Sequence, residues 1–88
     1  MDEKIQKVLE EKINEYTSKG IEITLLVKSL GHIENPKVFG HGIIIGRLYN
    51  SFYYQSRRIL KRNPTEQEFS EFIQLLKEHE NELEISFS

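Results

Sequence analysis

The residues PKVFGHGIIIGRLYNSFYYQSRRILKR, positions 36–62, decide the fold of this chain. They predict one long helix, because Asn35 can cap the first turn and Pro36 suits the first helical position. At about 100° per residue the apolar side chains fall on one arc, whereas a strand would scatter them over both faces. The members of this arc are Leu48, Ile59, Phe52, Ile45, Tyr49, Leu60 and Tyr53.

The opposite arc of the helix is polar and basic. Arginine and lysine neutralise phosphates, and a tyrosine among them can stack on a base. The arc therefore indicates either an anionic partner such as DNA or RNA, or a solvated side whose charge is neutralised by acids of the last helix. Asn50, Ser51 and Gln55 flank it. We call its core the basic face: Arg47, Tyr54, Arg57, Arg58, Lys61 and Arg62.

Two glycines interrupt the apolar side of this helix. Gly42 and Gly46 are four residues apart, on the side that also carries Tyr49 and Tyr53. Glycine inside a helix costs about 1 kcal/mol relative to alanine, so two on one side predict the close approach of another helix, within the chain or from a second subunit. Alternatively, the regular helix begins only near residue 43. The spacing is not that of the dinucleotide fingerprint G-x-G-x-x-G.

Length and composition predict a single small domain over residues 1–88. The chain has no cysteine, so helix packing or oligomerisation must supply its stability. No apolar run approaches the ~20 residues of a membrane span, and the charged N-terminus does not resemble a signal peptide. We therefore expect a cytoplasmic protein without contact with a membrane, and a homodimer is a natural way for so small a core to gain buried surface.

The charges are strongly segregated along the chain. Residues 35–65 contain six bases and no acid, whereas residues 66–88 contain seven acids and Lys77 as the one base. The net charge of −2 conceals this asymmetry. Because the overall charge is acidic, strong non-specific binding to DNA is disfavoured.

The N-terminal third predicts a helix followed by an ambiguous segment. Apolar residues recur at helical spacing over residues 2–19, and Gly20 suits the position after a helix end. Residues 21–30, IEITLLVKSL, fit a strand by their alternation and a helix by Gly31 just past their end. The lack of a neighbouring hairpin partner favours the helix.

The C-terminal third begins at a clear break. Asn63 precedes Pro64, which disfavours helix there, and Thr65 with Glu68 forms a capping-box pattern. A helix over residues 66–79 should then fold back on the central helix as an αα-hairpin. The last residues, ELEISFS, alternate like a strand, so residues 80–88 are either a flexible tail or a strand.

No catalytic or metal-binding motif is apparent in the sequence. The three histidines, His32, His41 and His79, are too far apart for helical zinc-ligand spacing, and no nucleophile elbow or paired buried carboxylates are present. We therefore expect no catalytic residue, no metal and no cofactor. A clustered set of aromatic side chains, by contrast, is typical of a core or an interface.

The sequence thus predicts a mainly α, four-helix bundle-like domain with a long central helix in an αα-hairpin. The alternative is an α+β fold with short strands at 21–28 and 82–87. The leading functional hypothesis is a non-enzymatic protein-interaction or regulatory module, dimeric, that uses the aromatic and basic sides of the central helix. The alternative is a small nucleic-acid-binding protein that contacts phosphates through the basic face.

Overall fold

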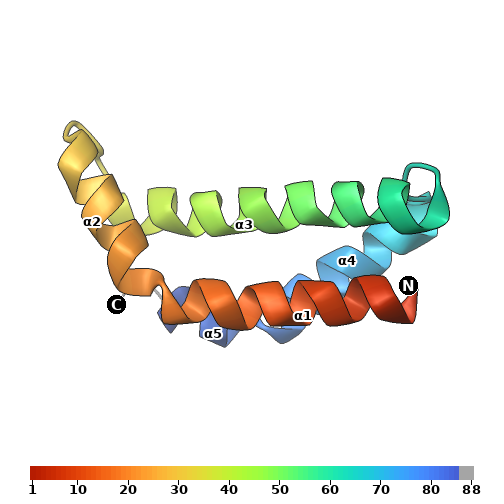
Figure 1. Ribbon diagram of the computed structural model, residues 1–88. Coiled ribbons are helices and arrows are strands. Elements are labelled where there is room, and N and C mark those ends of the chain that lie inside the picture. Colours follow the sequence, from red (N-terminus) through yellow and green to blue (C-terminus); the bar gives the residue numbers. More distant parts are fainter. Residues whose placement is uncertain (86–88) are drawn as a thin grey trace.

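The computed structural model describes residues 1–85 and is almost entirely helical (Figure 1). Two long helices, α1 and α3, run antiparallel along the molecule, and α2 stands at an angle to both at one end. The predicted mainly α class is confirmed. The elements are α1 (Glu3–Ser18), α2 (Gly20–Leu30), α3 (Pro36–Gln55), the π-helical turn η1 (Ser56–Leu60), α4 (Glu66–Glu78) and α5 (Glu80–Ile85).

Side-chain caps mark where α1, α3 and α4 begin. The Oδ1 atom of Asp2 accepts from the backbone N–H groups of Lys4 and Ile5 at 2.9 and 3.1 Å. The Oδ1 atom of Asn35 accepts from the N–H of Val38 at 3.1 Å, with proline in the first turn of α3. Each cap satisfies N–H groups that have no partner within the helix. The predicted helix starts at residues 36 and 66 are therefore confirmed.

The two segments with strand-like alternation are helical. Residues 21–30 lie in α2, so the strand alternative at 21–28 is wrong. At the C-terminus the strand alternative for 82–87 is wrong for residues 82–85, which belong to α5, and its remainder lies outside the described residues. The physical reason at α5 is Leu83, which is 1% exposed and belongs to the core. The described chain therefore has five α-helices rather than the four predicted.

One hydrophobic core joins all five helices. In α3 its members recur every four residues, at Ile44, Leu48 and Phe52, and the line is continued by buried Gly40 and Ser56. The core residues of α1 that face this line are spaced by four and three residues, and residues at these spacings share one side of a helix. The facing residues are Ile5, Leu9, Ile13 and Tyr16.

This buried line is rotated from the centre of the predicted apolar arc. Tyr49, predicted to be mostly core, is 46% exposed, whereas Gln55, predicted to be polar surface, is 8% exposed. The apolar surface of α3 is wider than its neighbours cover, so packing selects one part of it. Tyr53 is partly buried against the core.

The central helix ends earlier than predicted. Regular α-helix stops at Gln55, and η1 continues it with wider turns to Leu60. The hydroxyl of Ser56 donates to the carbonyl of Phe52 at 2.8 Å inside the core. Lys61 adopts a left-handed conformation with φ of 61°, which closes the helix, so the prediction that it extends to Arg62 is wrong.

The hairpin between α3 and α4 is held by aromatic rings. Phe52 stacks on Phe72 with ring centroids 4.5 Å apart and planes inclined by 2°. Thr65 and Glu68 form the predicted capping box, with bonds of 3.1 and 2.9 Å. The N-terminal amine also pairs with Glu71, which ties the start of α1 to α4.

The molecule is elongated for its size. It measures 39 × 21 × 18 Å, and its radius of gyration of 13.8 Å exceeds the roughly 12 Å of an ordinary domain of this length. The long dimension follows α1 and α3, because α3 with η1 alone is roughly 35 Å long at about 1.5 Å per residue (Figure 1). None of the helices within residues 1–85 is long and apolar enough to cross a bilayer.

Candidate interaction site on α3

The uncovered side of α3 carries a shallow groove. We call it the α3 groove; its volume is about 400 Å³, and it is lined by Gly46, Tyr49, Asn50, Tyr53 and Arg57. These positions recur at intervals of three and four, so they share one helix side. The groove exists because the buried line of α3 is rotated away from this side of the helix.

The two glycines of this side face open space. A Cβ atom added at Gly42 or at Gly46 would meet no other atom within 4 Å. The prediction of close helix packing at these residues within the chain is therefore wrong. The reason is that the helices packed most closely on α3, which are α1 and α2, cover other sides of it. Packing of a second subunit at Gly42 and Gly46 stays a prediction.

Two tyrosines form the wall of the α3 groove. The rings of Tyr49 and Tyr53 meet edge to face, with centroids 5.2 Å apart. A side-chain hydrogen bond to Tyr53 is the main cause of a raised pKa of Tyr49, because it favours the protonated phenol of Tyr49. Phe69 of α4 extends the aromatic surface, since its ring lies 6.3 Å from that of Tyr49. At the other end the Arg57 guanidinium lies 5.9 Å from the centre of the Tyr53 ring.

The structure separates the predicted basic face into three parts. Arg47 lies 4.5 Å from the ring centre of Tyr16 on α1, a cation–π contact that occupies its guanidinium within the chain. Arg62 forms a two-pronged pair with Glu68, at 2.6 and 3.3 Å. We expected acids that follow residue 65 to neutralise part of the basic face. For Arg62 this is confirmed, because Glu68 of α4 pairs with it.

The third part of the basic face stays exposed. Arg57, Arg58 and Lys61 form no ion pair with any residue in the described range 1–85, and Tyr54 beside them is 55% exposed. Arg58 donates to the side-chain oxygen of Gln55 at 3.3 Å, which is a contact with a neutral group. The cations of this part are therefore not neutralised by a carboxylate of residues 1–85, and binding of an anionic partner by the six predicted residues stays a prediction.

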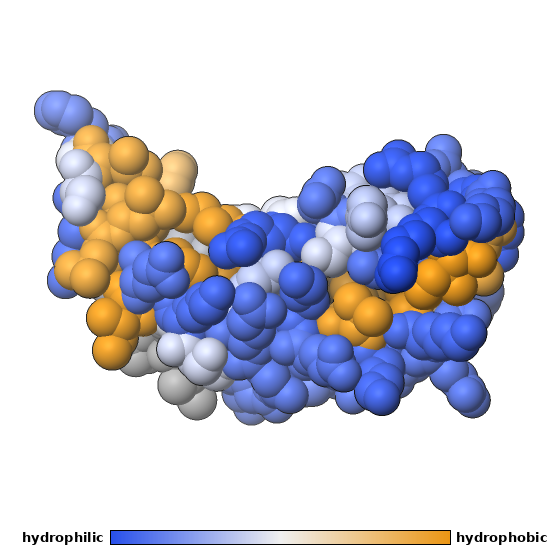
Figure 2. All heavy atoms as spheres, viewed as in Figure 1, coloured by the Kyte–Doolittle hydropathy of each residue, from blue (hydrophilic) through white to orange (hydrophobic). Residues whose placement is uncertain are grey.

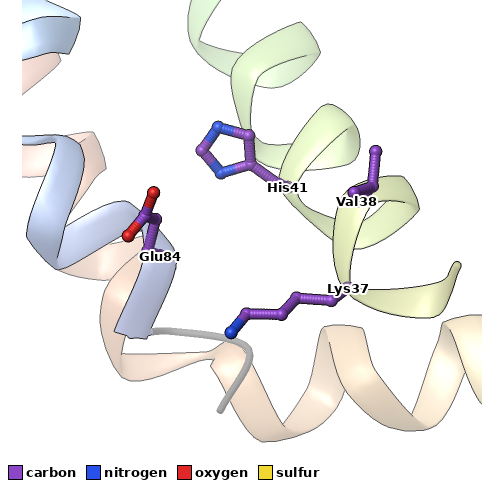
Figure 3. Close-up of a pocket in the computed structure, with 4 residues that line it drawn as sticks. All are labelled: Lys37, Val38, His41 and Glu84. Carbon is purple, nitrogen blue, oxygen red and sulfur yellow. The ribbon is translucent and has the colours of Figure 1, made fainter.

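A second, smaller pocket lies between the start of α3 and the end of α5. It has a volume of about 260 Å³ and is lined by Lys37, Val38, His41 and Glu84. Figure 3 shows the carboxylate of Glu84 and the imidazole of His41 on opposite sides of this space, with the Lys37 amine near the end of α5. The sequence did not indicate this pocket, because Glu84 reaches it only through the helical course of residues 80–85.

The other two histidines, His32 and His79, lie next to helix ends. His32 lies in the turn between α2 and α3 with φ of 55°. His79 ends α4, and its Nδ1 atom lies 3.1 Å from a carboxylate oxygen of Glu82. Among residues 1–85 no group of three or more histidine and carboxylate side chains is arranged to hold a metal ion.

The exposed apolar side chains of α2 were not predicted from the sequence. Ile21, Leu25, Leu26 and Leu30 are exposed, although the same helix buries Ile23 and Val27. Figure 2 shows hydrophobic side chains gathered over this end of the molecule. The signal was present in the composition of residues 21–30, since apolar residues occur on every side of that helix.

Comparison of the chain with protein-family models, with curated proteins and with solved structures finds no match.

Proposed function

We propose that this protein is a non-enzymatic protein-interaction module that binds a partner in the α3 groove. One observation carries the proposal: the groove exposes aromatic rings that the rest of the described chain does not cover. Tyr49, which lines the space of about 400 Å³, is 46% exposed, and Phe69 of α4, whose ring lies 6.3 Å from that of Tyr49, is 38% exposed. Exposed apolar groups gathered at one place are typical of interaction surfaces rather than of scattered surface residues.

The composition of the groove supports a protein as its occupant. Tyrosine and arginine are enriched among the residues that dominate binding energy, and both occur here, at Tyr49, Tyr53 and Arg57. The open position at Gly46 lets a partner approach the helix backbone closely. Arg57 makes no ion pair with a described residue, so a carboxylate on the partner could neutralise its positive charge. The proposed partner is therefore a protein segment with apolar side chains and an acidic residue.

Nucleic-acid binding is the second candidate. It is favoured by the exposed cluster of Arg57, Arg58 and Lys61 with Tyr54, which combines cations with one aromatic ring. It is weakened by the engagement of Arg47 and Arg62 within the chain. Three cations are a small number for phosphate contacts, because affinity grows with each phosphate that is neutralised.

A matched pair of substitutions separates the two candidates. Arg57→Glu and Arg58→Glu make the same charge change at adjacent exposed positions, but only Arg57 lines the α3 groove. A groove-bound protein partner should be lost with Arg57→Glu and retained with Arg58→Glu. Immobilised wild type and both variants are incubated with extract, and the retained proteins are compared by mass spectrometry.

Fluorescence anisotropy with labelled single- and double-stranded DNA and RNA gives the complementary result. If nucleic acid is the partner, both variants should weaken binding by similar factors, and the wild-type affinity should fall steeply with salt. If no protein depends on Arg57 and no nucleic acid binds even at low salt, the α3 groove is not the interaction site.

A further inference from the structure

The exposed surface of α2 is unusual for a helix of a single-chain domain. One side of α2 packs into the core through Ile23 and Val27. The opposite side carries two large apolar residues that are more than half exposed, Ile21 at 79% and Leu25 at 61%, and Leu26, 50% exposed, lies about 100° from Leu25 around the helix. Helices that are hydrophobic all round are ordinarily buried on all sides. Within residues 1–85, however, the outer side of α2 stays uncovered.

Further exposed apolar residues lie at the end of α2 and in the first turn of α3. Leu30 is 54% exposed, and in the first turn of α3 Val38 is 64% and Phe39 is 43% exposed. We call these residues the α2 surface: Ile21, Leu25, Leu26, Leu30, Val38 and Phe39. In Figure 2 hydrophobic atoms form a broad patch at the α2 end of the molecule, bordered by polar atoms.

The size of the α2 surface matches one side of a stable dimer. A large apolar side chain presents on the order of 200 Å² when fully accessible, so these exposed fractions correspond to on the order of 700 Å². The largest apolar patch of a typical monomer is about 300–600 Å², and a standard interface buries about 800 Å² per partner. The whole molecule also exposes 6025 Å², against roughly 5400 Å² for an ordinary monomer of its mass.

The charges beside the α2 surface favour a second copy of the chain over other occupants. Exposed Glu22 and Lys28 lie on opposite flanks of Leu25, each about 60° from it around the helix. One acid and one base give a neutral surface, which can meet its own copy without net repulsion, as a two-fold interface requires. An anionic lipid surface or a nucleic acid would instead select a predominantly basic rim.

We propose that the α2 surface is the interface of a homodimer in which α2 of one protomer packs against α2 of its partner. This assignment rests on the proposed interaction function and deepens it. Self-association is assigned to α2, and the α3 groove, which lies on another part of the molecule, is left open for a different protein.

The test is the molar mass in solution as a function of protein concentration. Sedimentation velocity and light scattering should show wild type approaching twice the mass of one chain as concentration rises. Leu25→Glu places a charge at the centre of the α2 surface and should remain monomeric over the same range. Because Leu25 is 61% exposed, the Leu25→Glu variant should fold normally, and its circular dichroism spectrum should match that of wild type. Tyr54→Glu, at a position 55% exposed on α3, is the matched control and should dimerise like wild type.

Cross-linking provides a second test of the dimer, and it does not require a charged residue to be introduced into the interface. The natural chain has no cysteine, so Leu25→Cys carries a single thiol. A short bismaleimide should link Leu25→Cys into covalent dimers and leave Tyr54→Cys monomeric. A monomeric wild type at the highest concentration, a Leu25→Glu variant that dimerises normally, or the reverse cross-linking pattern would overturn the assignment.

The two proposals fail separately. Leu25→Glu should still capture any protein that depends on Arg57, because the α3 groove is unchanged. If wild type is monomeric but that capture persists, the dimer is overturned and the interaction function stands. If wild type dimerises through α2 but no protein depends on Arg57, the α3 groove loses its assignment and the α2 interface stands.

Discussion

At the residue scale, Glu68 joins two structural elements. Its carboxylate accepts hydrogen bonds from the guanidinium of Arg62 at 2.6 Å and from the backbone N–H of Thr65 at 2.9 Å. The bond from Arg62 is the largest cause, and that from Thr65 the next, of a pKa of Glu68 lowered to about 2. The Glu68 side chain therefore caps α4 and also binds Arg62, the last residue of the basic face.

This pKa predicts how stability depends on pH. Because the pKa is lower in the folded state than its ordinary value of 4.5, the unfolded state takes up the proton first. The contribution of Glu68 is complete above pH 4.5 and is lost as the pH falls towards 2. Urea unfolding measured across this range should show the loss in wild type, and Glu68→Gln should reduce the pH-dependent step.

Glu66→Gln is the control for this experiment, since Glu66 lies in the same turn but forms no ion pair with a described residue. It should keep the wild-type pH dependence between 4.5 and 2. An identical pH profile for wild type and Glu68→Gln would show that the pair contributes nothing to stability, as is common for exposed ion pairs.

Phe52 is the residue on which the core depends most directly. Its side chain is 0% exposed, and it stacks on Phe72 of α4. Phe52→Ala should lower the free energy of unfolding by about 3–5 kcal/mol, because it removes a buried ring and leaves a cavity. Urea denaturation measures the change. Tyr54→Ala, two residues away and 55% exposed, should stay within about 0.5 kcal/mol of wild type.

At the scale of elements, α3 combines a packed side with an unpacked one. The packed side is the line of Ile44, Leu48 and Phe52, and the unpacked side holds Gly42 and Gly46. Glycine weakens a helix, and nothing in the chain occupies the space that a Cβ atom would fill at either position. The glycines therefore lower the stability of α3 without a packing benefit inside the protomer.

Replacing these glycines should stabilise the protein. Gly42→Ala and Gly46→Ala should each raise the free energy of unfolding by up to about 1 kcal/mol, measured by urea denaturation. Gly31→Ala is the contrast, because its φ of 64° strains any side chain, and it should destabilise the protein. If Gly46→Leu keeps its stability but loses the partner that depends on Arg57, the open position is used for binding.

For the fold as a whole, one core connects the first helix with the last one of the described residues. The start of α1 is linked to α4 through the amine of Met1 and Glu71, and α5 inserts Leu83 beside the other helices. The segments of this small domain thus share a single set of buried side chains, which is the usual basis of cooperative unfolding.

Leu83→Ala tests this cooperativity. Leu83 is 1% exposed, so its truncation should cost about 2–5 kcal/mol, although it lies in a helix of six residues. Tyrosine fluorescence reports on α1 and α3, and circular dichroism reports on all helices. The two unfolding curves should shift together. A variant that loses only the helicity of α5 would show that α5 folds apart from the core.

Local signals in the sequence were enough to predict where several helices begin and that acids after residue 65 pair with the basic segment. Asp2, Asn35 with Pro36, and Thr65 with Glu68 are local capping signals, and they act through bonds to residues within one turn. The pairing of Arg62 with Glu68 likewise follows from six residues of separation across a short connection. These features could be predicted because the interactions behind them are local in sequence.

Tertiary structure alone decided which surfaces are buried. The apolar arc of α3 is too wide for one neighbour, so the sequence could not indicate that Gln55 is buried while Tyr49 is exposed. A segment as short as α5 has little helical stability of its own, and burial of Leu83 fixes its form. For the same reason the α3 groove and the α2 surface became visible only once the packing of the other helices was known.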